Sequence, residues 1–208
     1  MRPKRLAVLL LVALAGCGGD DAPVSPEVRA AGLRFAPTVT QGDREWILEA
    51  IAQARPEARA LVEDVDGMVV ISTYSDRHAR AVGLTSPKAP GAYDVSFNVA
   101  MLNTDRKIDR ATTVLHEFGH VIDDAVVPVE LRDRLAGQLP SVGGCVSQDT
   151  GDCTAPAERF ADTFAKWALR GAVSAAGAGY GVATPASLED WGAPLASLAI
   201  EIDVAAGR

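Results

Sequence analysis

The sequence is poor in aromatic residues, in basic clusters and in long apolar runs. Aromatic residues make up 5% of the 208 residues, and 27 Asp and Glu outnumber 20 Lys and Arg, giving a formal net charge of −7. An acidic surface repels phosphate backbones, and few aromatic side chains remain for base stacking, so nucleic-acid binding is disfavoured. The uncharged run at residues 6–16 would form about 16 Å of helix, roughly half of the ~30 Å hydrocarbon core, so we expect no permanent transmembrane helix.

The N-terminus has the pattern of an exported lipoprotein. Three of the first five residues are basic, and an apolar run follows them, which is typical of a secretory signal. Residues 14–17 (LAGC) resemble the lipobox of bacterial lipoproteins, in which the cysteine is acylated. An ordinary signal peptide that ends near a cysteine is the alternative. We therefore predict a signal peptide at 1–16, lipidation at Cys17, and a membrane-anchored, extracytoplasmic protein of the bacterial cell envelope.

The mature chain is expected to consist of a tether and one domain with a disulfide. Residues 17–41 are rich in Pro, Gly and Asp without clear periodicity, which predicts a flexible tether before a domain at 42–208. Cys145 and Cys153 remain as an even pair in an oxidising compartment, and the polar segment between them allows closure. A metal site is the alternative for this pair, but CxxC spacing and a neighbouring His are missing. We predict a disulfide.

Apolar periodicity predicts a small sheet followed by a mainly helical C-terminal part, an α+β fold. Helical spacing extends over 43–64, with a break or restart at Pro56. Short β-rich runs predict strands at 68–73, 81–85 and 93–101, and SPKAPG before the last of them predicts a turn. Apolar stripes and end signals predict helices at about 105–125, 129–139, 155–170 and 185–204, with a glycine-rich loop at 171–184.

The central helix carries a metal-binding motif. Residues 116–120 (HEFGH) place His116 and His120 four apart, so both imidazoles converge on one point and can bind one Zn²⁺. Glu117 lies one step round the helix, where it can reach the attacking water without ligating the metal. His pairs with this spacing also occur on solvated helices, but this helix has a continuous apolar stripe that packs it against a core. We predict a zinc site with Glu117 as general base.

Catalytic zinc needs a third protein ligand and an open position. His78, the third His of the chain, is one candidate. Glu158 and Asp162 are better candidates because they lie four residues apart on the next long helix, opposite its apolar face. Either carboxylate could bind the metal. If Glu158 does, Asp162 would accept the free ring N–H of His116 and fix its tautomer, as a residue of the second coordination layer.

These two helices, HEFGHVIDD and ERFADTFAKWAL, resemble the catalytic domain of anthrax lethal factor and its relatives, including secreted Pro-Pro endopeptidases. Those proteins are gluzincin metallopeptidases, and the resemblance covers about residues 95–170. It implies a zincin-like fold and a substrate cleft lined by the strand before the first of these helices. It also implies that the zinc ligands are His116, His120 and Glu158, with Glu117 as the base.

One departure from those relatives concerns the oxyanion. They carry a Tyr shortly before the ligand Glu that hydrogen-bonds the developing charge, and residues 149–152 (DTGD) offer none. Tyr180 in the glycine-rich loop is a candidate replacement, and Tyr93 and His78 are the others.

The sequence therefore predicts a zinc-dependent endopeptidase that cleaves extracytoplasmic or secreted protein substrates. An edge strand near 95–101 is expected to hold an extended peptide by main-chain hydrogen bonds. One alternative is a zinc-containing binding lipoprotein that has lost turnover, since the expected Tyr is missing. Another is a structural lipoprotein whose zinc stiffens two helices. Neither alternative needs a base at Glu117, which favours the enzyme.

Overall fold

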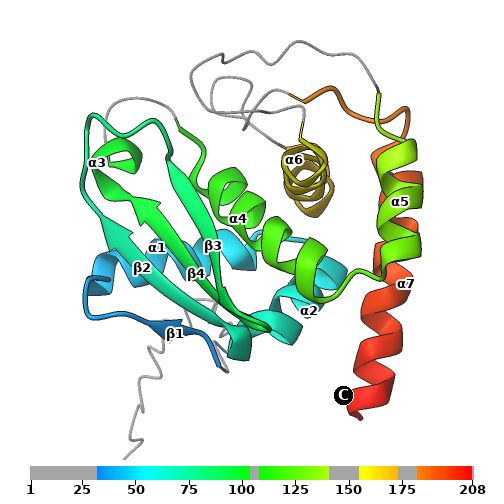
Figure 1. Ribbon diagram of the computed structural model, residues 1–208, viewed down its shortest axis with the longest axis horizontal. Coiled ribbons are helices and arrows are strands. Elements are labelled where there is room, and N and C mark those ends of the chain that lie inside the picture. The colour runs from blue at the N-terminus through cyan, green and yellow to red at the C-terminus, as the bar shows by residue number, and fades with distance from the viewer. Residues whose placement is uncertain (1–31, 104–107, 141–154, 173–181, 208) are drawn as a thin grey trace, which may run out of the picture.

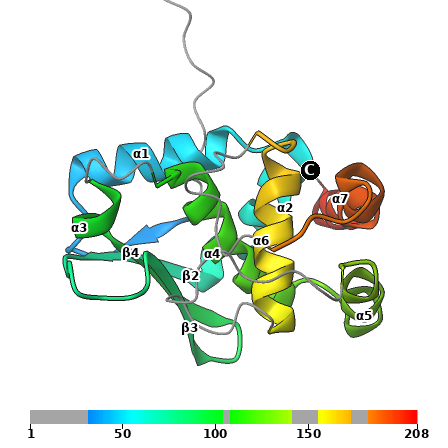
Figure 2. The same cartoon turned by 90° about the horizontal axis from the view of Figure 1, so that it is seen from above.

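A small sheet and a set of helices lie side by side in the computed structural model (Figure 1). The structure describes residues 32–103, 108–140, 155–172 and 182–207. Within these ranges the chain has four strands and seven α-helices, which confirms the predicted α+β class. Helix α4 (Arg110–Ala125) lies between the sheet and helix α6 (Pro156–Ala168) in both views (Figures 1 and 2). The two chain segments with the predicted ligands are therefore neighbours.

The first two helices confirm the predicted break at Pro56. Helix α1 (Gln41–Ala52) ends before it, and α2 (Pro56–Val65) begins with this proline at its first position, where the missing N–H would have no helical partner. The backbone N–H of Arg55 donates to the carbonyl of Ala168 at 2.9 Å. The joint between α1 and α2 is thereby fixed to the C-terminal end of α6.

The sheet is mixed and has the strand order β1-β2-β4-β3. Its strands are β1 (Arg34–Phe35), β2 (Val69–Tyr74), β3 (Gly83–Ala89) and β4 (Ala92–Asn98), and a 3₁₀ turn, η1 (Asp66–Met68), precedes β2. Strands β1, β2 and β4 are parallel, whereas β3 runs antiparallel to β4. Because β1 lies within the predicted tether, the folded part begins before Gly42.

The prediction of an edge strand at 95–101 is wrong. Strand β4 lies between β2 and β3, and after Asn98 the chain turns into the short helix α3 (Val99–Leu102). In the part of the chain that the structure describes, no strand pairs with the far side of β3, so β3 is the edge strand there, and it extends through most of the segment predicted as a turn. Strand β3 contains polar residues and Pro87, so its sequence does not show the apolar alternation that predicts a strand. Proline is nevertheless tolerated in edge strands, where its missing N–H breaks no ladder hydrogen bond. The actual turn lies at Gly91, whose φ is 68°.

Helix α4 begins later than predicted. Its N-cap is Asp109, whose carboxylate accepts from the backbone N–H of Thr112 at 2.9 Å. The predicted start at 105 falls in residues 104–107, outside the described ranges, but Ile108 and Asp109 already precede the helix. Most of the apolar face of α4 is buried, with Leu115, Phe118 and Ile122 in the core and Ala125 partly buried against it. This confirms the predicted stripe.

The remaining helices support α6 from the side away from the sheet. Helix α5 spans Val129–Gly137 and α7 spans Leu188–Ala206. At Gly192 a Cβ atom would lie 2.0 Å from the indole nitrogen of Trp167, so α7 packs on α6 at a distance that only glycine permits. The indole N–H of Trp191 donates to the carbonyl of Leu135 at 3.2 Å and joins α7 to α5.

Several predicted features lie outside the described residues. They are the signal peptide at 1–16, Cys17, the pair Cys145 and Cys153, and Tyr180. They stay predictions. Among the helices that the structure describes, none has the length and apolar character needed to cross a bilayer.

Candidate metal centre

Helix α4 brings two imidazoles together. His116 and His120 follow one another by one helical turn, and their Nε2 atoms are 3.2 Å apart. The two rings meet nearly at right angles, with centroids 4.8 Å apart. His116 is buried, whereas His120 is partly buried and lines a surface pocket. This is the convergence that the spacing of four predicts.

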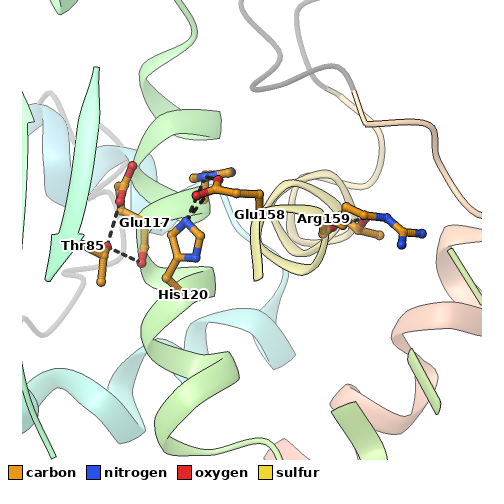
Figure 3. Close-up of polar contacts among 7 residues, drawn as sticks. Thr85, Glu117, His120, Glu158 and Arg159 are labelled. Carbon is orange, nitrogen blue, oxygen red and sulfur yellow. Dashed lines mark hydrogen bonds and ion pairs between the residues drawn. The ribbon is translucent and has the colours of Figure 1, made fainter. Parts of the chain in front are cut away.

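Glu158 reaches the same point from the first turn of α6. Its Oε2 atom is 3.2 Å from Nε2 of His116 and 3.5 Å from Nε2 of His120 (Figure 3). The approach of the two helices depends on Gly119, where a Cβ atom would lie 2.9 Å from the Cα atom of Ala161. The glycine between the two histidines thus sets the distance between α4 and α6, and with it the position of Glu158.

The three side chains could hold a metal ion. Their ligand atoms all lie within 4.8 Å of one another, and among the described residues this is the one such group of three. Two histidines and one carboxylate bound at about 2.0–2.1 Å to a tetrahedral Zn²⁺ have ligand atoms about 3.3 Å apart. The three separations in the structure are 3.2, 3.2 and 3.5 Å. The donor set and its spacing therefore fit a tetrahedral ion.

The group is also strongly coupled electrostatically. Burial disfavours the charge of Glu158, but hydrogen bonds from His116 and His120 outweigh burial and lower the pKa of Glu158 to about 2. Burial opposes protonation of His116, and the hydrogen bond to Glu158 and the surrounding carboxylates outweigh it and raise the pKa of His116. Carboxylates thus surround the imidazoles, an environment that favours a cation at this point.

Glu117 faces a different partner, strand β3. The hydroxyl oxygen of Thr85 lies 2.8 Å from Oε2 of Glu117 and 3.0 Å from its backbone carbonyl oxygen (Figure 3). A Cβ atom on Gly83 would lie 2.4 Å from Oε1, so the carboxylate occupies space that only glycine leaves. Glu117 is 5% exposed and does not belong to the three-residue ligand group. Glu117 therefore stands outside the three-residue group, one residue along α4 from His116.

A cleft of about 590 Å³ runs beside these residues. Strand β3 forms one wall, and Glu117, His120 and Glu158 lie along it. Tyr93 and Asp124 also line the cleft, and the hydroxyl of Tyr93 donates to Oδ2 of Asp124 at 2.6 Å. Burial and this carboxylate raise the pKa of Tyr93 to about 12. The phenol is therefore engaged and remains neutral, a poor placement for the oxyanion role that sequence reasoning considered.

The other predicted site residues lie as follows. Asp162 is fully buried, and its Oδ2 atom accepts from Nζ of Lys166 at 2.5 Å. Its negative charge is among the causes that raise the pKa of His116, but it is not part of the ligand group. His78 is exposed in the turn after β2, outside that group, and its backbone N–H donates to Oδ1 of Asp76 at 2.8 Å.

Sequence reasoning missed Gly83, Thr85 and Lys166. The contact of Lys166 with Asp162 could have been found, since the two are four apart on one helix. The contacts of Gly83 and Thr85 with Glu117 had no sequence signal because they depend on which strand lies beside α4.

The chain was also compared with protein-family models, with curated proteins and with solved structures, and none of them matches it.

Proposed function

We propose that this protein is a zinc-dependent endopeptidase of the gluzincin type with a zincin-like fold. The observation that carries the proposal is the convergence of His116, His120 and Glu158 within 4.8 Å, with Glu117 beside them in the same cleft. A structural metal site is closed by four protein ligands, whereas a catalytic site has three and keeps one position open. Among the described residues three ligands are found, and two of them, His120 and Glu158, line an open cleft, which favours the catalytic type.

The donor set supports zinc. Two imidazoles and one carboxylate are a combination that Zn²⁺ takes in hydrolases, and softer metals would favour thiolates. Bound zinc would supply a Lewis acid that polarises the scissile carbonyl and lowers the pKa of a water molecule toward about 7.

Glu117 would move the proton. Its carboxylate accepts the proton of the attacking water and returns it to the leaving amine, so that one residue serves first as base and then as acid. Its place one residue after His116 keeps it close to the reacting atoms, while its contact with β3 keeps it out of the ligand group.

The open edge of β3 supports an extended peptide as substrate. The carbonyl of Val82 accepts from the backbone N–H of Asn98, so this residue faces β4. Since backbone groups alternate along an antiparallel pair, those of Gly83 and Thr85 face the open edge, next to Glu117. Added-strand pairing with these groups would place a peptide bond across the cleft. Pro87 offers a carbonyl but no donor, which limits the pairing at that end.

A binding protein without turnover is the second candidate, and the position of Tyr93 favours it. In the described part of the cleft this phenol donates to Asp124, so it is not available to a developing oxyanion. Loss of one such donor typically costs about 10²-fold or more in turnover. A zinc lipoprotein of this kind would bind a peptide at β3 without cutting it.

We propose that the protein is extracytoplasmic in the bacterial cell envelope, anchored through lipid on Cys17, with extracytoplasmic or secreted proteins as its substrates. The support is the LAGC pattern at 14–17 that follows the apolar run. Metabolic labelling with a fatty acid is expected to mark the wild type and not Cys17→Ser. Equal labelling of both would refute the anchor.

The peptidase proposal is tested with a diverse peptide library and mass spectrometry of new termini. The zinc-loaded wild type is expected to cleave. Glu117→Gln should bind zinc equally well and lose turnover by about 10²–10⁴-fold, because the amide cannot accept the proton. A zinc chelator should abolish cleavage. If the zinc-loaded wild type cleaves no more than Glu117→Gln across the library, the binding-protein candidate replaces the enzyme.

A further inference from the structure

The carboxylate of Glu117 is held from two sides by one strand. We propose that Thr85 and Gly83 of β3 are positioning residues that orient Glu117 for proton transfer, an inference that rests on the proposed peptidase function. The two residues alternate with Leu84 and therefore face the same side of the sheet, toward α4. Thr85 provides a hydrogen-bond donor, and Gly83 provides the space that the carboxylate fills.

The hydroxyl of Thr85 has one proton to donate and two oxygens within reach. Oε2 of Glu117 is 2.8 Å away and the backbone carbonyl oxygen of the same residue is 3.0 Å away. An ionised carboxylate is the stronger acceptor, so the proton goes to Oε2. That bond fixes the rotation of the carboxylate, which on a solvated glutamate turns freely among several rotamers. The second oxygen, Oε1, then has one defined place.

That place lies against Gly83. A Cβ atom there would be 2.4 Å from Oε1, 2.7 Å from Cγ and 2.8 Å from Cδ of Glu117, and these are the three nearest atoms. The φ angle of Gly83 is not positive, so alanine can adopt the same backbone conformation. Replacement of Gly83 by alanine therefore displaces the side chain of Glu117 and leaves the path of the strand unchanged.

A structural role alone does not account for this arrangement. Glu117 is buried, and among the described residues it forms no ion pair with Lys, Arg or His. A buried carboxylate that has a neutral donor and no ion pair lowers stability. A chain that needed only to join β3 to α4 would be more stable with an apolar residue at this position. The stability lost by burying Glu117 is explained if its carboxylate acts in the cleft that it lines.

The experiment compares Thr85→Val, Thr85→Ser and Gly83→Ala with the wild type, each loaded with zinc and assayed on a peptide from the library. Valine keeps the shape of threonine and removes the donor, so kcat should fall by about 10- to 100-fold, the usual effect of a hydrogen bond to a charged group. KM and zinc affinity should stay within about 3-fold. Serine should restore kcat to within about 3-fold. Ser86→Ala is the matched control, because it removes a hydroxyl from the other face of the same strand.

A second readout does not depend on turnover. In high-resolution crystal structures, Glu117 should occupy one rotamer in the wild type and several in Thr85→Val, and it should be displaced in Gly83→Ala. The proposal is overturned if Glu117 keeps its single rotamer in Thr85→Val, or if that variant retains wild-type kcat. Absence of cleavage by the wild type would instead refute the peptidase proposal, while the crystal structures would still test the positions of Thr85 and Gly83.

Discussion

His116 and Glu117 are consecutive residues, yet each depends on a different part of the molecule. His116 meets Glu158 of α6 through helix–helix packing, whereas Glu117 meets Thr85 of β3 through strand–helix packing. One step along α4 turns a side chain by about 100° and so separates the two neighbourhoods. Under the proposed function, changes in α6 should therefore disturb metal binding, and changes in β3 should disturb proton transfer, each without the other.

The largest effect is expected from removal of a ligand. Zinc affinity should fall sharply in each of His116→Ala, His120→Ala and Glu158→Ala. The loss should exceed the roughly 10–100-fold that is typical when a residue hydrogen-bonded to a metal ligand is replaced. Competition with a fluorescent chelator measures the affinity. Thr85→Val is the control, because it alters the contact with β3 and leaves the three ligands in place. An equal loss of zinc affinity in Thr85→Val would show that the contact with β3 and the three-ligand group are not independent.

Asp162→Ala should have the next largest effect and should act on two properties. It leaves the buried ammonium of Lys166 without its carboxylate, which costs about 3–5 kcal/mol of stability. It should also weaken zinc binding by about 10–100-fold through its charge near His116. Urea unfolding and zinc titration measure the two effects. The double variant Asp162→Ala/Lys166→Met should regain stability but not zinc affinity.

The same zinc titrations show which carboxylate of α6, Glu158 or Asp162, binds the metal. If Asp162→Ala abolishes zinc binding while Glu158→Ala retains it, the assigned ligand is the wrong carboxylate. The geometry favours Glu158, since its Oε2 atom is 3.2 Å from the Nε2 atom of His116.

Gly119→Ala should disturb the metal side of α4 by a smaller amount. The new methyl group would meet the Cα atom of Ala161 at 2.9 Å and push α6 outward. Overpacking costs about 1–3 kcal/mol and the gain in helix propensity returns about 1 kcal/mol, so stability should fall by about 0–2 kcal/mol. Zinc affinity should also fall, because Glu158 moves outward with α6.

Gly137→Ala is the matched control for Gly119→Ala. Gly137 lies at the end of α5, and a Cβ atom there has nothing within 4 Å. It should therefore be neutral or slightly stabilising in thermal unfolding. A stability loss as large as that of Gly119→Ala would contradict the packing explanation.

The smallest effect is expected from Tyr93→Phe. The phenol pKa of about 12 in the folded protein lies above the ordinary value of 10. The folded state therefore holds the proton more tightly, so the associated stability is complete below pH 10 and is lost as the pH rises toward 12. Tyr93→Phe should remove this loss and cost about 1 kcal/mol at neutral pH. Turnover should change by less than about 10-fold, whereas an oxyanion role would predict about 10²-fold.

The sequence predicted the parts of the site that lie within one element. The pair His116 and His120 and the proposed base Glu117 follow from the periodicity of one helix, and the structure confirms the helix that the apolar stripe predicted. Glu158 needed the resemblance, because no periodicity relates α4 to α6. The edge position of β3 could not be predicted, since strand order is a tertiary property and the polar sequence around Pro87 is typical of a turn.

The most direct test of the proposed roles of His116 and Glu117 is a crystal structure of the zinc-loaded protein, with zinc located by anomalous scattering. We predict one ion within about 2.0–2.2 Å of Nε2 of His116, Nε2 of His120 and a carboxylate oxygen of Glu158. Glu117 should lie outside the coordination shell and keep its hydrogen bond from Thr85. Zinc coordinated by Glu117, or bound away from these three ligands, would contradict the account.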